Sequence, residues 1–431
     1  MASTPAPPAP QPVKANTTER GTALAGYAGQ GAALDFLETN PQLRWPLSIS
    51  VFDQMRTQDA QVISTMRAIK LPIRRARWQI NPASAPAEVV AFVAGELGLP
   101  VAGQDPVLPP RTRDRFSWAD HLRHALLCLD FGHSFFEQVY RIEEANGRLW
   151  ARLRKLGPRL PQTISAINVA RDGGLESVQQ WNLNAGAHTD PIPVSALVAY
   201  TNEREGANWL GQSLLRSAYK NWLLKDQGLR TWAIRDDRNG MGVPIYTAAP
   251  GETDLAPGTK IATDIRSGAT AGAGISNGAD LALKGVQGEL ADPEKQVRYH
   301  DEQIARGVLA HFLNLGTQTG SWALGSTFAD FFTMSLQAVA DDIADTATQH
   351  IVEDLVDLNF GTDVPAPKVV CEPIGSRKDA TAEAIKILRD AGVLSTDEDL
   401  DRFVREIYGL PAPKPGAAAA PAPTTEQETN P

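Results

Sequence analysis

The sequence of residues 292–361 is DPEKQVRYHDEQIARGVLAHFLNLGTQTGSWALGSTFADFFTMSLQAVADDIADTATQHIVEDLVDLNFG, and it predicts two helices joined by a loop. Asp292 and Pro293 match an N-cap acid followed by proline at the first helical position, and apolar residues then recur at helical spacing as far as Leu315. From Phe328 to Leu358 apolar residues again keep steps of three or four, which predicts a helix of roughly 45 Å. That length is more than twice the usual length of a globular helix.

Residues 316–326 interrupt this pattern between the two helices. Three glycines and four hydroxyl residues leave little to pack, and only Trp322 and Leu324 are large. We therefore expect a loop of small polar residues, with the long helix beginning at Phe328.

The composition is that of a soluble protein with two or three packed units. The chain has 431 residues, of which 42% are hydrophobic and 21% are charged, and no apolar run approaches the ~20 residues of a membrane span. The first 20 residues and residues 411–431 are rich in proline and alanine, and we expect both to be disordered tails and not a secretory signal. A net charge of −9 argues against a protein whose main task is gripping phosphates.

The rest of the chain predicts a mixed α+β fold with antiparallel hairpins. Asn146-Gly147 and Asp172-Gly173-Gly174 mark hairpin turns, and helices are expected over 52–70, 116–130, 208–226, 380–391 and 395–408. Leu71-Pro72 is expected to end the first of these helices, before a strand over 73–80. Cys128 and Cys371 lie in hydrophobic contexts far apart, which favours buried thiols over a disulfide.

Motifs of catalysis are weak. His121, His124 and His133, with Glu137, suggest a metal site, but a turn separates the two halves and capping or surface roles are favoured. Residues 211–215 lack the last glycine of a hydrolase elbow, and the glycine-rich residues 268–278 match neither a dinucleotide fingerprint nor a P-loop. We therefore assign no catalytic, cofactor-binding or metal-binding residue, and no cofactor.

The long helix is strongly acidic. It has no lysine or arginine between Phe328 and Phe360, and its seven acids are Asp330, Asp341, Asp342, Asp345, Glu353, Asp354 and Asp357. One interpretation is a solvated face, or pairing with arginines elsewhere. The alternative is a surface that faces polyanionic DNA without binding it tightly.

Seven short motifs, in this order along residues 43–410, resemble the portal proteins of tailed bacteriophages, especially the Mu-type branch. They are RAIKLP at 67–72 with WQINP at 78–82, FGHSFFE at 131–137, NWLGQSLLR at 208–216 with Lys225-Asp226, GMGVP at 240–244 and GSWALG at 320–325. The resemblance implies a portal fold, which has a mixed α+β wing, a helical stem, a small clip, a long wing helix with a tunnel loop, and a helical crown.

The resemblance also implies limits for these parts. After a tail at 1–21, the first part of the wing would cover 22–249, the first stem helix and clip 250–291, and the second stem helix 292–315. The tunnel loop would follow at 316–327, then the long wing helix and the end of the wing at 328–375. The crown would occupy 376–410, before the second tail at 411–431.

From the same resemblance we expect a ring of about twelve copies at one capsid vertex of the virion, assembled in the host bacterial cytoplasm. Double-stranded DNA would pass through the channel without sequence-specific contacts, and no membrane would be involved. The other expected partners are the terminase large subunit, the major capsid and scaffolding proteins, and head-tail adaptor proteins.

Two groups of residues are expected to meet these partners. The tunnel loop would present Thr317, Gln318, Thr319, Gly320, Ser321, Trp322 and Leu324 to DNA, and the clip would present Gly268, Gly272, Gly274 and Asn277 to the packaging motor. The alternatives are a minor capsid or head-tail adaptor protein and a metal-dependent hydrolase that uses His121, His124 and His133.

Overall fold

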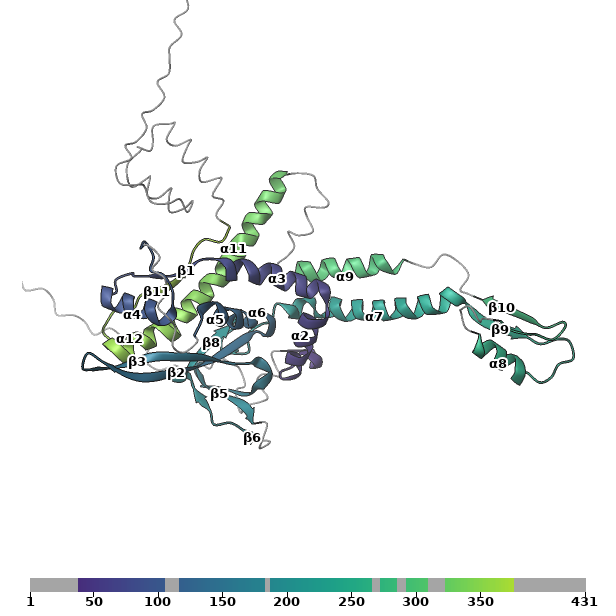
Figure 1. The fold of residues 1–431 in the computed structure, drawn as a ribbon, viewed down its shortest axis with the longest axis horizontal. Coiled ribbons are helices and arrows are strands. Elements are labelled where there is room, and N and C mark those ends of the chain that lie inside the picture. The colour runs from purple at the N-terminus through teal and green to yellow at the C-terminus, as the bar shows by residue number, and fades with distance from the viewer. Residues whose placement is uncertain are drawn as a thin grey trace, which may run out of the picture. The chain divides into compact units, whose positions relative to one another are not determined.

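The computed structural model describes residues 38–104, 116–182, 187–265, 272–284, 292–308 and 322–375 (Figure 1). Contacts divide the chain into residues 1–372 and residues 373–431. Only 373–375 of the second unit are described, so the helices expected at 380–391 and 395–408 lie outside the described residues, as do both tails. No helix in the described ranges is long and apolar enough to cross a membrane.

Short helices begin the first unit. They are the 3-10 turn η1 (Pro41–Leu43), α2 (Leu47–Gln58), α3 (Ala60–Arg75), α4 (Ala87–Leu97), α5 (Trp118–Ala125) and α6 (Leu127–Phe131). The helix expected over 52–70 is therefore two helices. Asp59 separates them, because its carboxylate accepts hydrogen bonds from the backbone N–H groups of Gln61 and Val62 and so starts α3.

The prediction that Leu71-Pro72 ends a helix is wrong. Pro72 lies inside α3, which continues to Arg75, and the strand expected over 73–80 shrinks to β1 (Trp78–Asn81). Tertiary packing explains the difference, since Ile73 is fully buried and its carbonyl accepts a hydrogen bond from the indole N–H of Trp78 at 3.1 Å. These contacts outweigh the hydrogen bond that proline removes.

Antiparallel strands form the centre of the first unit. One sheet has the order β3-β2-β8, from β2 (His133–Ala145), β3 (Arg148–Arg159) and β8 (Leu197–Thr201). A second sheet joins β4 (Ile164–Val169), β5 (Leu175–Asn182), β6 (Ala187–His188) and β7 (Ile192–Pro193), and the 3-10 turns η2 (Pro161–Thr163) and η3 (Val194–Ala196) flank it. The two sheets share a core of Phe135, Ile164, Ile167, Leu175, Val178, Leu197 and Ala199. The predicted α+β class with antiparallel hairpins is confirmed.

The long helix is also confirmed. It runs through α11 (Trp322–Ala347), the π-helical turn η4 (Thr348–Val352) and α12 (Glu353–Phe360), and β11 (Lys368–Cys371) then pairs with β1. Its buried apolar side follows the predicted spacing through Leu336, Ile343, Ala347, Ile351 and Leu355. Cys128 and Cys371 are buried free thiols, as predicted.

Polar side chains fix the long helix against β2 and β3. The amide of Gln138 donates to the backbone carbonyl of His350 at 2.8 Å and to the carboxylate of Asp354 at 2.7 Å. Farther along, the side chain of Asn359 bonds both the N–H and the carbonyl of Ala151, on β3. These bonds satisfy backbone groups that would otherwise lie unpaired at an edge strand and at the π-helical turn.

Candidate functional site

Two long helices form an antiparallel hairpin outside the sheets. They are α7 (Leu215–Met241) and α9 (Pro293–Gly307), which lie side by side (Figure 1). Ser217 donates to the carbonyl of Gly307 at 2.7 Å, and Asn221 and His300 are hydrogen-bonded at 3.2 Å. Asp292 accepts a hydrogen bond from the N–H of Glu294, so the predicted N-cap of α9 is confirmed.

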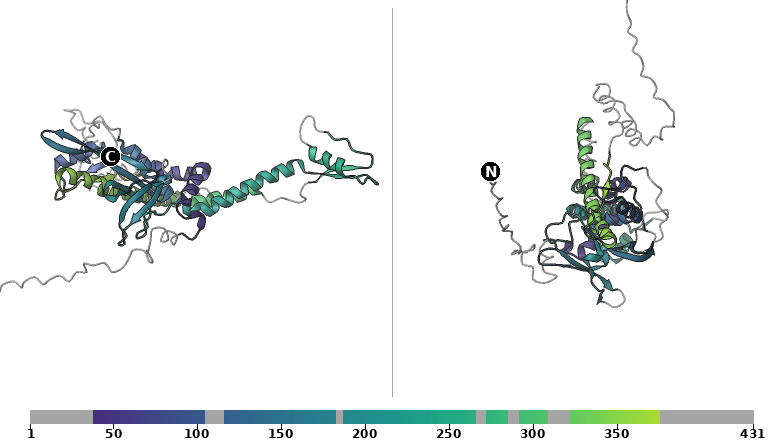
Figure 2. Two further views of the ribbon diagram at one scale, coloured as in Figure 1. Left: turned by 90° about the horizontal axis from the view of Figure 1, so that it is seen from below. Right: turned by 90° about the vertical axis from the view of Figure 1, so that its left-hand side faces the viewer.

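The helix that pairs with α9 is not the one expected from the sequence, which would lie within 250–291. Within the described part of 250–291 the only helix is α8 (Ala256–Asp264), whereas the helix that pairs with α9 lies before residue 250. Figure 2 shows α7 as one uninterrupted helix. The sequence does indicate this long helix, because no proline falls between Leu215 and Met241. The helix stops at Gly242, which has a φ of +69°.

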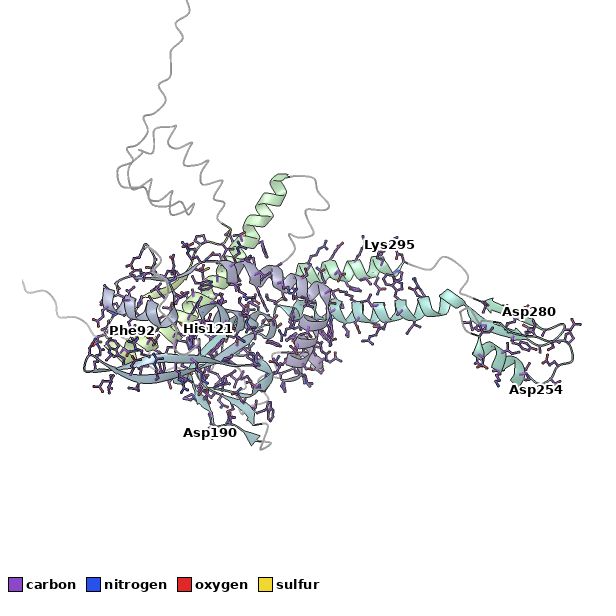
Figure 3. The ribbon with its side chains drawn as sticks, viewed as in Figure 1. Phe92, His121, Asp190, Asp254, Asp280 and Lys295 are labelled. Carbon is purple, nitrogen blue, oxygen red and sulfur yellow. The ribbon has the colours of Figure 1, made fainter. Side chains whose placement is uncertain are left out.

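A small unit follows α7. It consists of β9 (Val243–Thr247), α8 and β10 (Asp280–Lys284), with β9 and β10 antiparallel. Gly258 of α8 lies against the ring of Tyr246, where an added Cβ atom would come within 2.0 Å of the ring. Figure 3 shows Asp254 and Asp280 on this unit.

Three of the four residues expected in the clip lie together in this unit. Gly272, Gly274 and Asn277 belong to the exposed segment that joins α8 to β10, and nothing lies within 4 Å of a Cβ atom built on either glycine. Gly268 lies outside the described residues. The described part of this segment is therefore exposed and open around both glycines.

The residues expected in the tunnel loop divide at Ser321. Thr317, Gln318, Thr319, Gly320 and Ser321 lie outside the described residues. Trp322 and Leu324 belong to the first turns of α11, so the expectation that the loop extends to Ser326 is corrected. The helical spacing in fact reaches back beyond Phe328, because Leu324 precedes it by four residues, and Gly325 and Ser326 only weaken a helix.

The acids of the long helix lack basic partners in the described part of the chain. No lysine or arginine lies within ion-pair distance of the carboxylates of Asp341, Asp342, Asp345, Glu353 and Asp357. Burial raises the pKa of Asp342, and the charges of Asp345 and Asp341 raise it further. The first interpretation of this helix offers a solvated face or pairing with arginines, and such pairing is not observed among these five described acids.

The three histidines do not form a metal site. His121 is hydrogen-bonded to the hydroxyl of Tyr200 at 2.8 Å, His124 to the carbonyl of Asp120 at 2.9 Å, and His133 to the carbonyl of Leu210 at 3.1 Å. Glu137 is ion-paired with Arg159 instead. Among the described residues, no group of three or more histidine, cysteine, aspartate or glutamate side chains is arranged to hold a metal ion. The arrangement of these histidines therefore gives no support to the hydrolase alternative.

The burial of two of these histidines predicts that the folded protein loses stability in acid. Burial lowers the pKa of His121 to about 3 and that of His133 to about 4, against about 6.5 in an unfolded chain. Between these values the unfolded chain binds protons that the folded chain does not. The free energy of unfolding should therefore be highest above pH ~6.5 and fall as the pH drops toward ~4, by up to about 1.4 kcal/mol per pH unit for each histidine.

Urea unfolding at several pH values measures this slope. His133→Asn retains a donor for the carbonyl of Leu210 and removes one titrating group, so it should flatten the slope. An unchanged slope in this variant would contradict the assignment.

Comparison with known proteins gives the following matches. Residues 49–410 match the family model described as the portal protein of Mu bacteriophage. No curated protein matches. Among solved structures, the neck of an empty gene transfer agent particle, computed with C6 symmetry, matches at a TM-score of 0.53 and 12% identity, over 84% of this chain and 94% of the other.

Two further structures match. The neck of a native gene transfer agent particle, computed with C12 symmetry, gives a TM-score of 0.52 at 12% identity, over 84% of this chain and 94% of the other. A HK97 family phage portal protein from Corynebacterium diphtheriae gives a TM-score of 0.41 at 14% identity, over 75% and 94%. At these identities the first two matches establish a shared fold.

Proposed function

Because the chain belongs to the family of Mu bacteriophage portal proteins, we propose that it is the subunit of a ring at one capsid vertex, through which DNA is packaged and ejected. The observation that carries this proposal is the family match over residues 49–410, which include the sheets, the α7–α9 hairpin and the long helix. The subunit would act as a passive conduit and not as an enzyme.

The proposed ring has about twelve copies and belongs to the virion. The shared fold with the necks of gene transfer agent particles, solved with C6 and C12 symmetry, supports a rotational arrangement. Rotational symmetry above two-fold needs two different surfaces on each subunit. The hairpin offers two such surfaces, since α7 and α9 expose different side chains such as Ile234 and Tyr299.

The α7–α9 hairpin corresponds best to the stem and the unit of α8, β9 and β10 to the clip. This proposal moves the first stem helix from 250–291 to α7 and leaves α9 as the second stem helix. The exposed segment with Gly272, Gly274 and Asn277 then becomes the docking site for the terminase large subunit and, later, for head-tail adaptor proteins. The major capsid and scaffolding proteins would surround the ring.

Weak contacts suit a channel for DNA. A strong phosphate contact would have to be broken at every step of translocation. The carboxylates of Asp341 and Asp345, which have no lysine or arginine partner among the described residues, and the net charge of −9 disfavour such contacts. Residues 317–321 supply only small or polar side chains. We propose that Thr317, Gln318, Thr319, Gly320 and Ser321, with Trp322 and Leu324 at the start of α11, form the part of the channel nearest to DNA.

Electron microscopy of the purified full-length protein tests this function. We expect closed rings of about twelve subunits with a central channel. A head-tail adaptor protein would instead join a preformed ring and would not close one alone. Particles that never close into rings at high protein concentration would overturn the proposal.

A further inference from the structure

Lys225 lies where the α7–α9 hairpin leaves the rest of the first unit. Its side chain is the last buried one on α7 as far as Asp236, after Leu215, Ala218 and Tyr219. On α9 the first buried side chain is that of His300, which is bonded to Asn221 one turn before Lys225. Lys225 therefore marks the base of the exposed part of the hairpin.

Two acids from different elements bind the ammonium group of Lys225. Its Nζ atom lies 2.9 Å from Oδ2 of Asp59, between α2 and α3, and 2.6 Å from Oδ1 of Asp301, on α9. The side chains of Lys225 and Asp59 are only 9% and 8% exposed. Buried charges of this kind are tolerated when they are paired. Removing one partner leaves the other charge buried without compensation, which strongly destabilises the folded protein.

The charged state of Lys225 follows from these contacts. Burial acts to lower its pKa, but the hydrogen bonds and charges of Asp301 and Asp59 outweigh burial and raise the pKa above its usual value. The cluster is therefore an ionic bridge at neutral pH.

Asp59 and Asp301 have different structural roles. Asp59 uses Oδ1 to cap α3, through the N–H groups of Gln61 and Val62, and has Oδ2 left for Lys225. Asp301 is itself part of the hairpin. α7 and α9 are also joined by the bonds of Ser217 and Asn221, and α3 packs against α9 as well. Loss of the Asp59 contact would therefore loosen the hairpin against α3 without separating its two helices.

We propose that Lys225 is the contact that sets the tilt of the α7–α9 hairpin against α3, and that the hairpin takes a second tilt when this contact is lost. A lysine is a compact charge on a flexible four-carbon stem, so it keeps both contacts through small rotations that an interlocked apolar contact would resist. Lys225 contacts Asp59 at the start of α3, and α3 packs against both α9 and α11. A change in the tilt of the hairpin would therefore change how α3 packs. This device is independent of whether the chain forms a ring.

Distances between spin labels test this role of Lys225. Labels at Thr231→Cys on α7 and Glu176→Cys on β5 occupy exposed positions, whereas Cys128 and Cys371 are buried. Labelled full-length chain is mixed with excess unlabelled chain so that only distances within one chain are measured. The wild-type background should give a single narrow distance, and Lys225→Met and Asp59→Asn should each add a second, shifted population.

Matched variants separate this role of Lys225 from a general loss of stability. Asparagine caps helices as well as aspartate does, so Asp59→Asn keeps α3. Lys225→Arg and Asp301→Asn retain a contact with Asp59 and should keep the single distance. The Lys225→Met, Asp59→Asn double variant should shift no further than either single variant. Wild-type distances in both single variants, or an equal shift in Asp301→Asn, would overturn the proposal, whatever the state of assembly.

Discussion

Deleting residues 317–321 should leave the proposed ring intact and lower the amount of packaged DNA by about tenfold or more, because these residues are proposed to line the channel nearest to DNA. The deletion stops before α11, which begins at Trp322, so the long helix keeps its full length. The ring should survive because its subunits are expected to meet through the large helical and sheet surfaces, which the deletion does not touch. Packaged DNA is measured in purified heads by nuclease protection.

A length-preserving variant is the matched control. Replacing Thr317, Gln318, Thr319 and Ser321 by alanine keeps the number of residues and removes the polar groups. Under weak, non-specific contact with DNA this variant should package nearly as much as wild type. Normal DNA-filled heads from the deletion would refute the loop assignment, whereas loss of the ring would show that these residues serve assembly.

Gly132→Ala should lower the free energy of unfolding by about 3–5 kcal/mol, from backbone strain together with steric overlap. Gly132 ends α6 at a φ of +92°, and a Cβ atom there would lie 2.3 Å from the carbonyl oxygen of Leu210. Gly211 is the reciprocal case, since its own added Cβ would lie 2.3 Å from the carbonyl oxygen of Gly132. The two backbones touch at this point, so neither can move aside for a methyl group.

Gly95→Ala provides the control for this change. Gly95 lies inside α4 with nothing within 4 Å of an added Cβ atom. Alanine there should be neutral or stabilise the protein by up to about 1 kcal/mol. Urea unfolding measures both variants, and a Gly132→Ala protein as stable as wild type would contradict the close backbone contact.

Local patterns predicted most of the regular structure. The Asn146-Gly147 turn between β2 and β3 takes positive φ at both residues, as a two-residue hairpin requires, and the apolar spacing of the long helix matches its buried side. The errors have two causes. Tertiary packing outweighs local preference at Pro72, which stays helical beside the buried Ile73. At α11 the helical spacing itself reaches back to Trp322, and the single glycine Gly325 does not end the helix.

The candidate site was less predictable than the fold. Asp59, Lys225 and Asp301 are far apart in the sequence, and each resembles an ordinary surface charge until the helices bring them together. The pairing of α7 with α9 also required the fold, because a helix pattern alone does not identify its partner. Gly272, Gly274 and Asn277 could be found from sequence, since a run rich in glycine predicts an exposed connection.

Native mass spectrometry of the purified full-length chain tests the central claim most directly. A portal subunit should give one dominant closed assembly of about twelve copies, without added partners. A monomer or dimer that persists as the protein concentration is raised would contradict the account.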